Sequence, residues 1–232
     1  MKKLQHGILI LLAINIVMVC MCYINRETRT TVKTIESNVE LETKIAENKG
    51  KIAITFDDGP IPGYTEKLLD GLQKRKVRAT FFVTGKHAKD SPELIKRMQE
   101  EGHLIGNHTY SHLQLTKKNE KEFIEEVKET NAVIKEITGE TTTYVRPPYG
   151  LWSKKCDEEL NMFPVLWTVD PRDWCTSNAN KIVCRVVGKV QENDIILMHD
   201  GYDPSVLAAL EIIDTLQEQG YEFVTVDEIL FD

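Results

Sequence analysis

Seven short apolar runs alternate with amphipathic segments from residue 51 to the end of the chain, and this alternation constrains the fold more than any other feature. The pattern predicts strands over 52–56, 79–83, 103–108, 143–146, 163–169, 194–198 and 222–226. It predicts helices over 64–76, 91–101, 119–138, 153–161, 178–191 and 205–219, followed by a last short helix. Strands that alternate with helices form a parallel sheet with right-handed crossovers.

The number of strand–helix units decides between two ways of arranging such a sheet. An eight-fold barrel typically has about 250 residues, and residues 51–232 hold seven units in a shorter span. We therefore expect an α/β fold of the TIM-like kind, a distorted seven-stranded (β/α) barrel. A doubly wound open sheet is the alternative. No Gly-x-Gly-x-x-Gly follows the first strand, which argues against a dinucleotide site.

The first 50 residues have a different composition from the rest. Two lysines precede an apolar run of 18 residues, Gly7–Ile24, which only Asn15 interrupts. Such a run is just long enough to cross a hydrocarbon core about 30 Å thick. A cleavable signal peptide has small residues at its exit, whereas this exit is bulky, with Val19, Met21 and Tyr23. The sequence thus predicts a signal-anchor transmembrane helix, a polar stalk and an exported domain, over 1–25, 26–50 and 51–232.

Location and partners follow from this N-terminal segment and from the charge. An anchor gives a single-pass protein of the cell membrane with an extracellular domain, and a cleaved signal peptide, the alternative, gives a secreted one. Basic residues flank the segment on both sides, so the positive-inside rule does not decide the orientation; an anchor ahead of a large domain favours a cytoplasmic N-terminus. The net charge of −7, without a Lys/Arg block, argues against nucleic acid as a partner.

Polar residues follow the strands of the predicted sheet. Both architectures place their chemistry at the carboxyl ends of strands. The titratable residues found there are Asp57, Asp58, His108, His112, Arg146, Asp170, Asp173 and His199.

The histidine pair and the aspartate pair suggest a metal site only when they are taken together. His108 and His112 are four residues apart, so one helical turn would put both imidazoles on the same side. Two such histidines and a carboxylate form a common catalytic metal face that leaves positions open for water and substrate. Asp57 or Asp58 is the nearest candidate carboxylate. By itself, a histidine pair of this spacing is more often unliganded, and an Asp-Gly-Pro run is first of all a turn.

Five short motifs occur in chain order: Thr55–Pro60 (TFDDGP), His108–His112 (HTYSH), Arg146–Gly150 (RPPYG), Asp170–Trp174 (DPRDW) and Leu197–His199 (LMH). Together they resemble the motifs of the polysaccharide deacetylases with a NodB-homology domain, carbohydrate esterase family 4. The resemblance covers about residues 52–230 and says nothing about the anchor or the stalk.

The resemblance implies a role for each motif. It implies that Asp57 is the general base and that Asp58, His108 and His112 are the metal ligands. In the family the ion is divalent; Zn²⁺ is our first choice, with Co²⁺, Ni²⁺ or Mn²⁺ as alternatives. Such an ion lowers the pKa of bound water to about 7 and polarises the acyl oxygen.

The remaining motifs resemble the groups that assist these residues. Arg146 resembles the arginine that pairs with the base, and the backbone N–H of Tyr149 resembles the donor to the oxyanion. His199 resembles the catalytic acid, which needs a carboxylate partner to raise its pKa and fix its tautomer. We choose Asp173 as that partner, with Asp170 as the second candidate. Trp174 and Leu197 would form the pocket for the acetyl methyl group; ordinary barrel core is the alternative for both.

The function implied is that of a metal-dependent hydrolase. It would remove the N-acetyl group of N-acetylglucosamine residues in a cell-surface polysaccharide, peptidoglycan first, and release acetate. The tyrosine of RPPYG resembles the branch of the family that acts on N-acetylglucosamine rather than N-acetylmuramic acid. The alternatives are a deacetylase of chitin oligomers or O-acetyl xylan, and a non-catalytic glycan-binding surface module. The expected partners are the polysaccharide and the membrane, and the chain is expected to be a monomer.

Two further sets of residues fall outside the motifs. His87 and His103 match none of them, and we expect both to be structural or at the surface. Cys156, Cys175 and Cys184 lie in the predicted exported domain, where their odd number leaves at least one thiol unpaired. A Cys156–Cys184 or a Cys175–Cys184 disulfide is one expectation, and buried thiols are the other.

Overall fold

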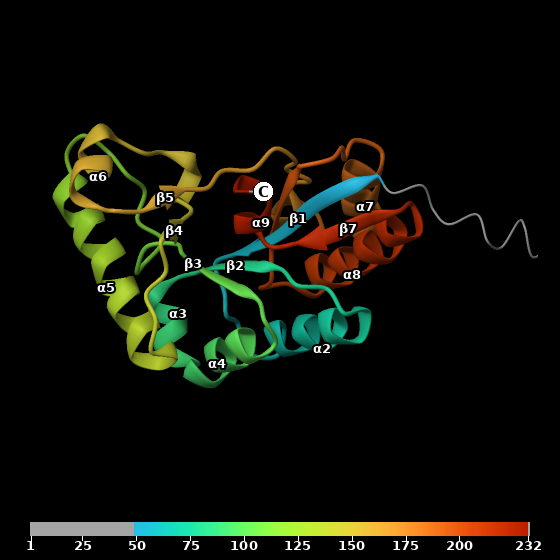
Figure 1. The fold of residues 1–232 in the computed structure, drawn as a ribbon, viewed down its shortest axis with the longest axis horizontal. Helices are drawn as coiled ribbons and strands as arrows, with labels where there is room; N and C mark the ends of the chain where they lie inside the picture. Colours follow the sequence, from blue (N-terminus) through green and yellow to red (C-terminus); the bar gives the residue numbers. More distant parts are fainter. Residues whose placement is uncertain (1–48, 232) are drawn as a thin grey trace, which may run out of the picture. The chain divides into compact units, whose positions relative to one another are not determined.

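The computed structural model describes residues 49–231, which form the body drawn in colour in Figure 1. The predicted membrane segment over 1–25 and nearly all of the predicted stalk lie outside these residues. Within the described part of the chain, no helix combines the length and the apolar character needed to cross a membrane. Membrane attachment therefore stays a prediction from the sequence.

Seven parallel strands form the sheet, as the alternating pattern predicted. They are β1 (Gly50–Asp57), β2 (Thr80–Val83), β3 (Leu104–Asn107), β4 (Tyr144–Val145), β5 (Phe163–Pro164), β6 (Ile195–His199) and β7 (Tyr221–Val224). Their order is β5-β4-β3-β2-β1-β6, and β7 pairs with the first half of β1. Beyond β5 the chain returns to the other edge, where Val169 bridges to Ile196 of β6. This contact curls the sheet into a half-barrel, which confirms the α/β parallel fold and argues against a flat open sheet.

Five predicted strands are shorter in the structure, and for two of them a local cause is visible. The run 163–169 forms only β5 and the bridge at Val169, because the carbonyls of Val165 and Leu166 accept hydrogen bonds from the Arg146 side chain at 3.1 and 3.2 Å. β7 ends at Val224 because Thr225 caps the next helix with a capping box. In this motif the Thr225 side chain accepts a hydrogen bond from the Glu228 backbone N–H, and the Glu228 side chain accepts one from the Thr225 backbone N–H.

Seven helices of the described residues lie between the strands, and an eighth follows the last strand. They are α2 (Thr65–Arg75), α3 (Gly85–Asp90), α4 (Pro92–Glu100), α5 (Glu120–Thr138), α6 (Lys154–Glu159), α7 (Ala179–Val187), α8 (Asp203–Glu218) and α9 (Val226–Leu230). The short α3 was not predicted; it directly follows β2 and begins where the Thr84 side chain accepts a hydrogen bond from the backbone N–H of His87. Two 3₁₀ turns, Pro148–Gly150 and Asp173–Cys175, follow β4 and precede α7.

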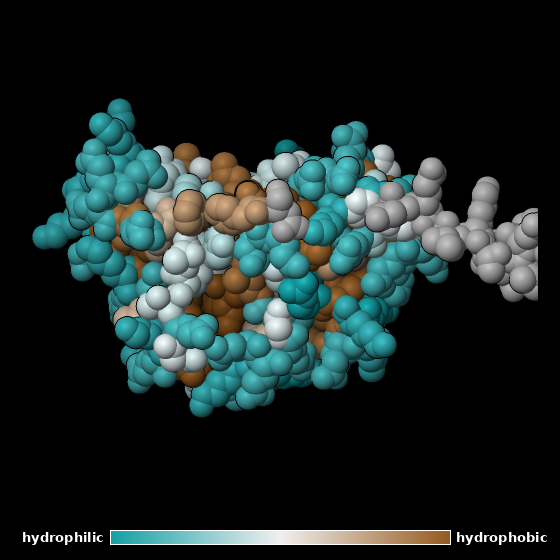
Figure 2. Space-filling model, viewed as in Figure 1, coloured by the Kyte–Doolittle hydropathy of each residue, from teal (hydrophilic) through white to brown (hydrophobic). Residues whose placement is uncertain are grey.

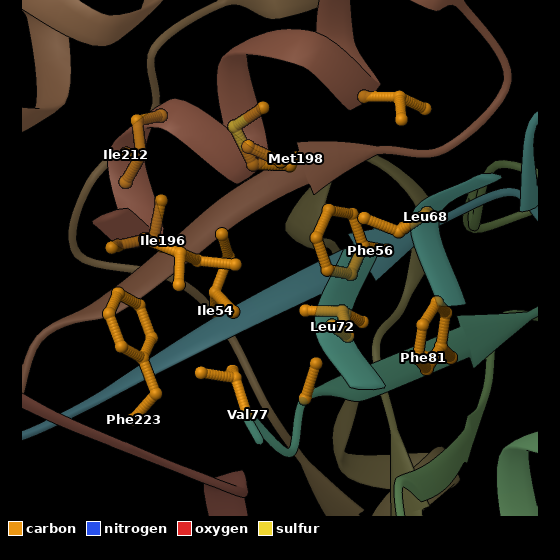
Figure 3. Packing of buried hydrophobic residues seen from close by; sticks show 14 of the residues in the cluster. Ile54, Phe56, Leu68, Leu72, Val77, Phe81, Ile196, Met198, Ile212 and Phe223 are labelled. Carbon is orange, nitrogen blue, oxygen red and sulfur yellow. The ribbon is translucent and has the colours of Figure 1, made fainter. Parts of the chain in front are cut away.

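Successive residues of each strand point to opposite faces of the sheet, and the two faces have different contents. Ile54 and Phe56 of β1 lie on the outer face, where they pack with Phe81, Ile196 and residues of α2 and α8 (Figure 3). Residues of α4 and α7 belong to the same cluster. The inner face carries a smaller apolar cluster towards the start of β1. Its members are Ala53, Phe82, Val165, Ile195 and Val226. Hydrophilic residues cover the outer helices in Figure 2, with hydrophobic residues in the hollow between them.

The alternation therefore decides where polar chemistry can lie. Ala53, Thr55 and Asp57 are two residues apart along β1 and so share the inner face. The apolar cluster fills this face near the start of the strand, and polar side chains replace it towards the carboxyl end. A site is thus expected inside the curl, at the end of β1.

Candidate active site

Asp57 and Arg146 form a buried ion pair at the end of β1. The Arg146 guanidinium donates to Asp57 Oδ1 at 2.8 Å and to Thr55 Oγ1 at 2.5 Å. Its remaining nitrogens donate to the carbonyls after β5, and its face lies 4.2 Å from the ring centroid of Phe82. Arg146 is 0% exposed and Asp57 is 3% exposed. Because each of its three nitrogens donates a hydrogen bond, the guanidinium is held in place and fixes the orientation of Asp57.

Asp58 points away from this pair, towards two histidines. Its backbone is in the left-handed region, with φ 75°, which aspartate adopts more readily than most residues. Asp58 Oδ1 lies 3.4 Å from His108 Nε2 and 3.4 Å from His112 Nε2. Burial would raise the pKa of Asp58, but the hydrogen bond and charge of His108 in its protonated form, with the charges of His112 and His199, outweigh burial and lower the pKa to about 2.

The three side chains fit a divalent metal ion. Their ligand atoms all lie within 4.8 Å of one another. Asp58 Oδ1 is buried without a hydrogen-bond partner among the described residues, as expected of an atom whose partner is an ion. His108 Nδ1 donates to the backbone carbonyl of Arg146 at 2.6 Å, so its Nε2 carries the lone pair that a metal requires. A set of two imidazoles and one carboxylate suits Zn²⁺ and similar ions.

The histidine pair is held by a loop, and the prediction of a helical turn was wrong. Thr109 and His112 both have left-handed backbones, with φ 61° and 62°. Glu126 of α5 accepts hydrogen bonds from the backbone N–H groups of Tyr110 and Ser111, at 3.1 and 2.9 Å, and from the Ser111 hydroxyl at 2.6 Å. The loop amides are thus satisfied by a side chain from a different element, which no spacing rule in the sequence would reveal.

His199 at the end of β6 has a carboxylate partner, and this partner is Asp173. His199 Nδ1 lies 2.8 Å from Asp173 Oδ1, and the His199 backbone N–H donates to Asp173 Oδ2 at 2.9 Å. Burial by itself would lower the pKa of His199, but the hydrogen bond and charge of Asp173, with the charges of Asp57 and Asp58, raise it to about 9. Asp170, the second candidate, instead accepts from the backbone N–H of Arg172 at 2.7 Å.

The three residues expected around the acetyl group have different surroundings. Tyr149 has a left-handed backbone with φ 60°, and its ring centroid lies 5.2 Å from that of His112. Trp174 is 62% exposed, so barrel core does not describe it. Leu197 is buried within β6, two residues before His199 and therefore on the same face of the strand.

A cavity of about 410 Å³ opens beside the three candidate ligands. It is lined by Asp58, His112, His199 and residues of α3 and of the loops after β3 and β6. His87 of α3 lines it too, and its Nδ1 lies 2.6 Å from the Asp58 carbonyl, so this histidine borders the site rather than an unrelated surface. His103 is buried and accepts a hydrogen bond from the Ala79 backbone N–H at 3.1 Å.

The cysteines of the described residues take no part in the site. Cys156 is buried, whereas Cys175 and Cys184 are exposed, and all three are free thiols. Neither predicted disulfide forms, and the expectation of buried thiols holds for Cys156 alone.

A curled β/α sheet with a His–His–Asp cluster, a buried Asp–Arg pair and a His–Asp pair at its carboxyl end is typical of metal-assisted hydrolases. Comparison with known proteins narrows this class. A family model described as polysaccharide deacetylase matches residues 44–165. The chain belongs to the polysaccharide deacetylase family, as the five motifs predicted.

Named relatives extend the match over most of the chain. The peptidoglycan-N-acetylmuramic acid deacetylase PdaC of Bacillus subtilis is 43% identical over 188 residues, which cover 81% of this chain and 40% of that protein. A peptidoglycan-N-acetylglucosamine deacetylase of Bacillus cereus is 36% identical over 206 residues, 85% of this chain and 96% of the relative. A solved structure of PdaC superposes with a TM-score of 0.76, over 78% of this chain and 90% of the other. The chain thus matches about two-fifths of the length of the first of these relatives.

Proposed function

We propose that this chain is a metal-dependent polysaccharide N-deacetylase that hydrolyses the acetamide of N-acetylglucosamine residues, with peptidoglycan as its first substrate. The single observation that carries the proposal is that three aspartates with different partners come together at one site. Asp57 pairs with Arg146, Asp58 lies beside two histidines, and Asp173 pairs with His199. Amide hydrolysis needs a base, a Lewis acid and a proton donor; Asp57 can act as the base, the Asp58 cluster can hold a Lewis-acidic ion, and His199 can donate the proton.

Each of the chain's own groups has a defined task in the proposed reaction. Asp58, His108 and His112 would hold a divalent ion, with Zn²⁺ first, and this ion would supply the Lewis acidity that activates water and polarises the acetyl carbonyl. Asp57, oriented by Arg146, accepts the proton of the attacking water. The backbone N–H of Tyr149 donates to the oxygen that gains charge.

The second half of the reaction needs an acid, because a sugar amine leaves poorly unless it is protonated. His199 is protonated at neutral pH when its pKa is about 9, and its Nδ1 is engaged by Asp173. Its Nε2 proton therefore goes to the nitrogen as the C–N bond breaks. The products are acetate and a free amine on the glycan.

Exposed aromatic rings around the site support a glycan substrate. Tyr149, Trp174 and Tyr202 are 63%, 62% and 57% exposed. The Tyr149 ring contacts His112, and Tyr202 lines the cavity. Flat rings of this kind cover the apolar faces of sugars. The printed names of the relatives include both an N-acetylmuramic acid and an N-acetylglucosamine deacetylase, so muramic acid is the second candidate for the residue that is deacetylated.

The test is a side-by-side assay of the metal-loaded protein. Free amine would be measured on peptidoglycan and on chitin oligomers, and acetate on acetylated xylan, with and without a chelator. After digestion of treated peptidoglycan, mass spectrometry identifies which sugar lost its acetyl group. We expect amine release from peptidoglycan that stops with the chelator. Acetate from xylan alone would make the chain an esterase, and glycan binding without any release would make it a binding module.

A further inference from the structure

Asp200 is a fully buried carboxylate directly behind the site, and none of the five motifs includes it. It follows His199 at the end of β6 and is 0% exposed. Its Oδ1 has no hydrogen-bond partner among the described residues. An isolated carboxylate in such a place is costly, and burial accordingly raises its pKa to about 7. A residue that destabilises the fold in this way needs a reason to be there.

The first contact of Asp200 reaches the turn that carries Asp58. Gly59 packs so closely on the Asp200 carboxylate that a Cβ at position 59 would overlap both of its oxygens. The glycine of the Asp-Gly-Pro run is therefore required by space as well as by the turn. The carboxylate forms the wall against which the residue after Asp58 rests.

The second contact is a hydrogen-bond chain to the far end of the same turn. The backbone N–H of Ile61 donates to Thr65 Oγ1 at 2.7 Å, and the Thr65 hydroxyl donates to Asp200 Oδ2 at 2.5 Å. Thr65 is the first residue of α2 and is completely buried. The Thr65 hydroxyl has a single proton, and it donates that proton to Asp200. This series of hydrogen bonds therefore requires an acceptor oxygen at position 200.

We propose that Asp200 is a positioning residue that fixes the Asp58 turn, and hence the candidate metal ligands, relative to His199. The two contacts hold residues 59 and 61 to the strand end that carries His199, so Asp58 and His199 are joined through a buried path. His87 completes the support from the opposite side, because its Nδ1 lies 2.6 Å from the Asp58 carbonyl. This inference rests on the proposed function, in which Asp58 holds a metal ion and His199 is the acid.

The experiment measures metal affinity separately from turnover and stability. Equilibrium dialysis of the full chain with Zn²⁺ gives the affinity, kcat and KM are measured on chitin oligomers, and thermal unfolding gives Tm. The variants are Asp200→Ala, Asp200→Asn, Thr65→Val and Thr65→Ser. The Asn and Ser side chains keep the shape and the hydrogen-bond chain, and the Ala and Val side chains remove it. Supporting groups of metal ligands typically change affinity by about 10–100-fold, and we expect a loss in that range for Asp200→Ala and Thr65→Val.

The matched control is Thr225→Val, at the other end of the barrel. Thr225 is 3% exposed and its hydroxyl lies 2.9 Å from Glu228, so the variant also loses a buried threonine hydrogen bond. It should lower Tm without changing metal affinity. Affinity and kcat restored by Asp200→Asn and Thr65→Ser would support the positioning role.

Two results separate this inference from the proposed function. If Asp200→Ala and Thr65→Val lower Tm but bind Zn²⁺ and turn over like the unaltered protein, Asp200 is a structural residue and the inference is wrong. If Asp200→Ala does not fold, the Thr65 pair decides by the same criterion. If the unaltered protein itself binds no metal and releases no amine, the proposed function fails, and this inference fails with it.

Discussion

Replacing Asp173 with asparagine should give a defect whose size depends on pH. The pKa of His199 is about 9 instead of the ordinary 6.5, chiefly because the hydrogen bond and charge of Asp173 outweigh burial. This difference corresponds to a stabilisation of the imidazolium on the order of 3 kcal/mol. In Asp173→Asn the charge is gone while burial remains, so the pKa of His199 should return to 6.5 or below.

The expected rates follow from the protonated fraction of His199. At pH 8 a group of pKa about 9 is about nine-tenths protonated, and one of pKa about 6.5 is about one-thirtieth protonated. Deacetylation by Asp173→Asn should therefore be roughly 30-fold slower at pH 8, beyond any loss from misorientation of the ring. At pH 6 both forms are largely protonated, and only the loss from misorientation remains.

Three measurements test this reasoning. The pH–rate profile should lose its alkaline plateau, and NMR titration of His199 in the metal-free protein should report the lower pKa. Since the folded pKa exceeds the unfolded one, the pair stabilises the fold fully below about pH 6.5, and this contribution disappears as the pH rises through about 9. The gap in unfolding free energy between the two proteins should narrow over that window. An equal rate defect at pH 6 and pH 8 would refute the electrostatic role of Asp173.

Four other substitutions or measurements test the rest of the site and the N-terminus. His112→Ala should abolish both tight metal binding and turnover, and full metal occupancy by elemental analysis would contradict the ligand assignment. Asp57→Asn should keep the metal but lose activity by about 10²–10⁴-fold, because an amide cannot accept a proton; a nearly unchanged rate would mean that Asp57 and Asp58 have exchanged roles. Glu126→Ala should free the loop amides of Tyr110 and Ser111 and weaken Zn²⁺ binding by roughly tenfold in equilibrium dialysis, and an unchanged affinity would show that the loop holds its shape without this carboxylate. Cell fractionation with N-terminal sequencing should find the protein in the membrane with residues 1–25 intact, and a mature protein in the medium that begins near residue 25 would show cleavage instead.

The sequence was informative wherever local patterns decide structure. The helix predicted over 119–138 is Glu120–Thr138 in the structure, because its apolar stripe and the left-handed Gly139 at its end are both local features. The collection of polar residues at one edge followed from a general property of parallel sheets. Neither inference required knowledge of which strand lies beside which.

Contacts between distant segments account for what the sequence did not reveal. The strand over 163–169 is interrupted because its carbonyls bond to Arg146, and this cannot be read from the apolar run itself. The loop that carries the histidines is fixed by Glu126, a half-buried residue beside the apolar face of an ordinary amphipathic pattern. Asp170 lies closer than Asp173 to the end of the predicted strand, yet the fold brings Asp173 to His199.

The three aspartates of the site show how one residue type acquires three chemical characters. Asp57 faces a guanidinium whose charge is permanent, so its partner holds it in place at every working pH. Asp58 faces two imidazoles through an oxygen that lacks a hydrogen bond, which leaves that oxygen available to a cation. Both carboxylate oxygens of Asp173 accept hydrogen bonds from His199, and the charge of Asp173 raises the pKa of this histidine. Different partners thus separate the base, the metal ligand and the support of the acid, although the side chain is the same at all three positions.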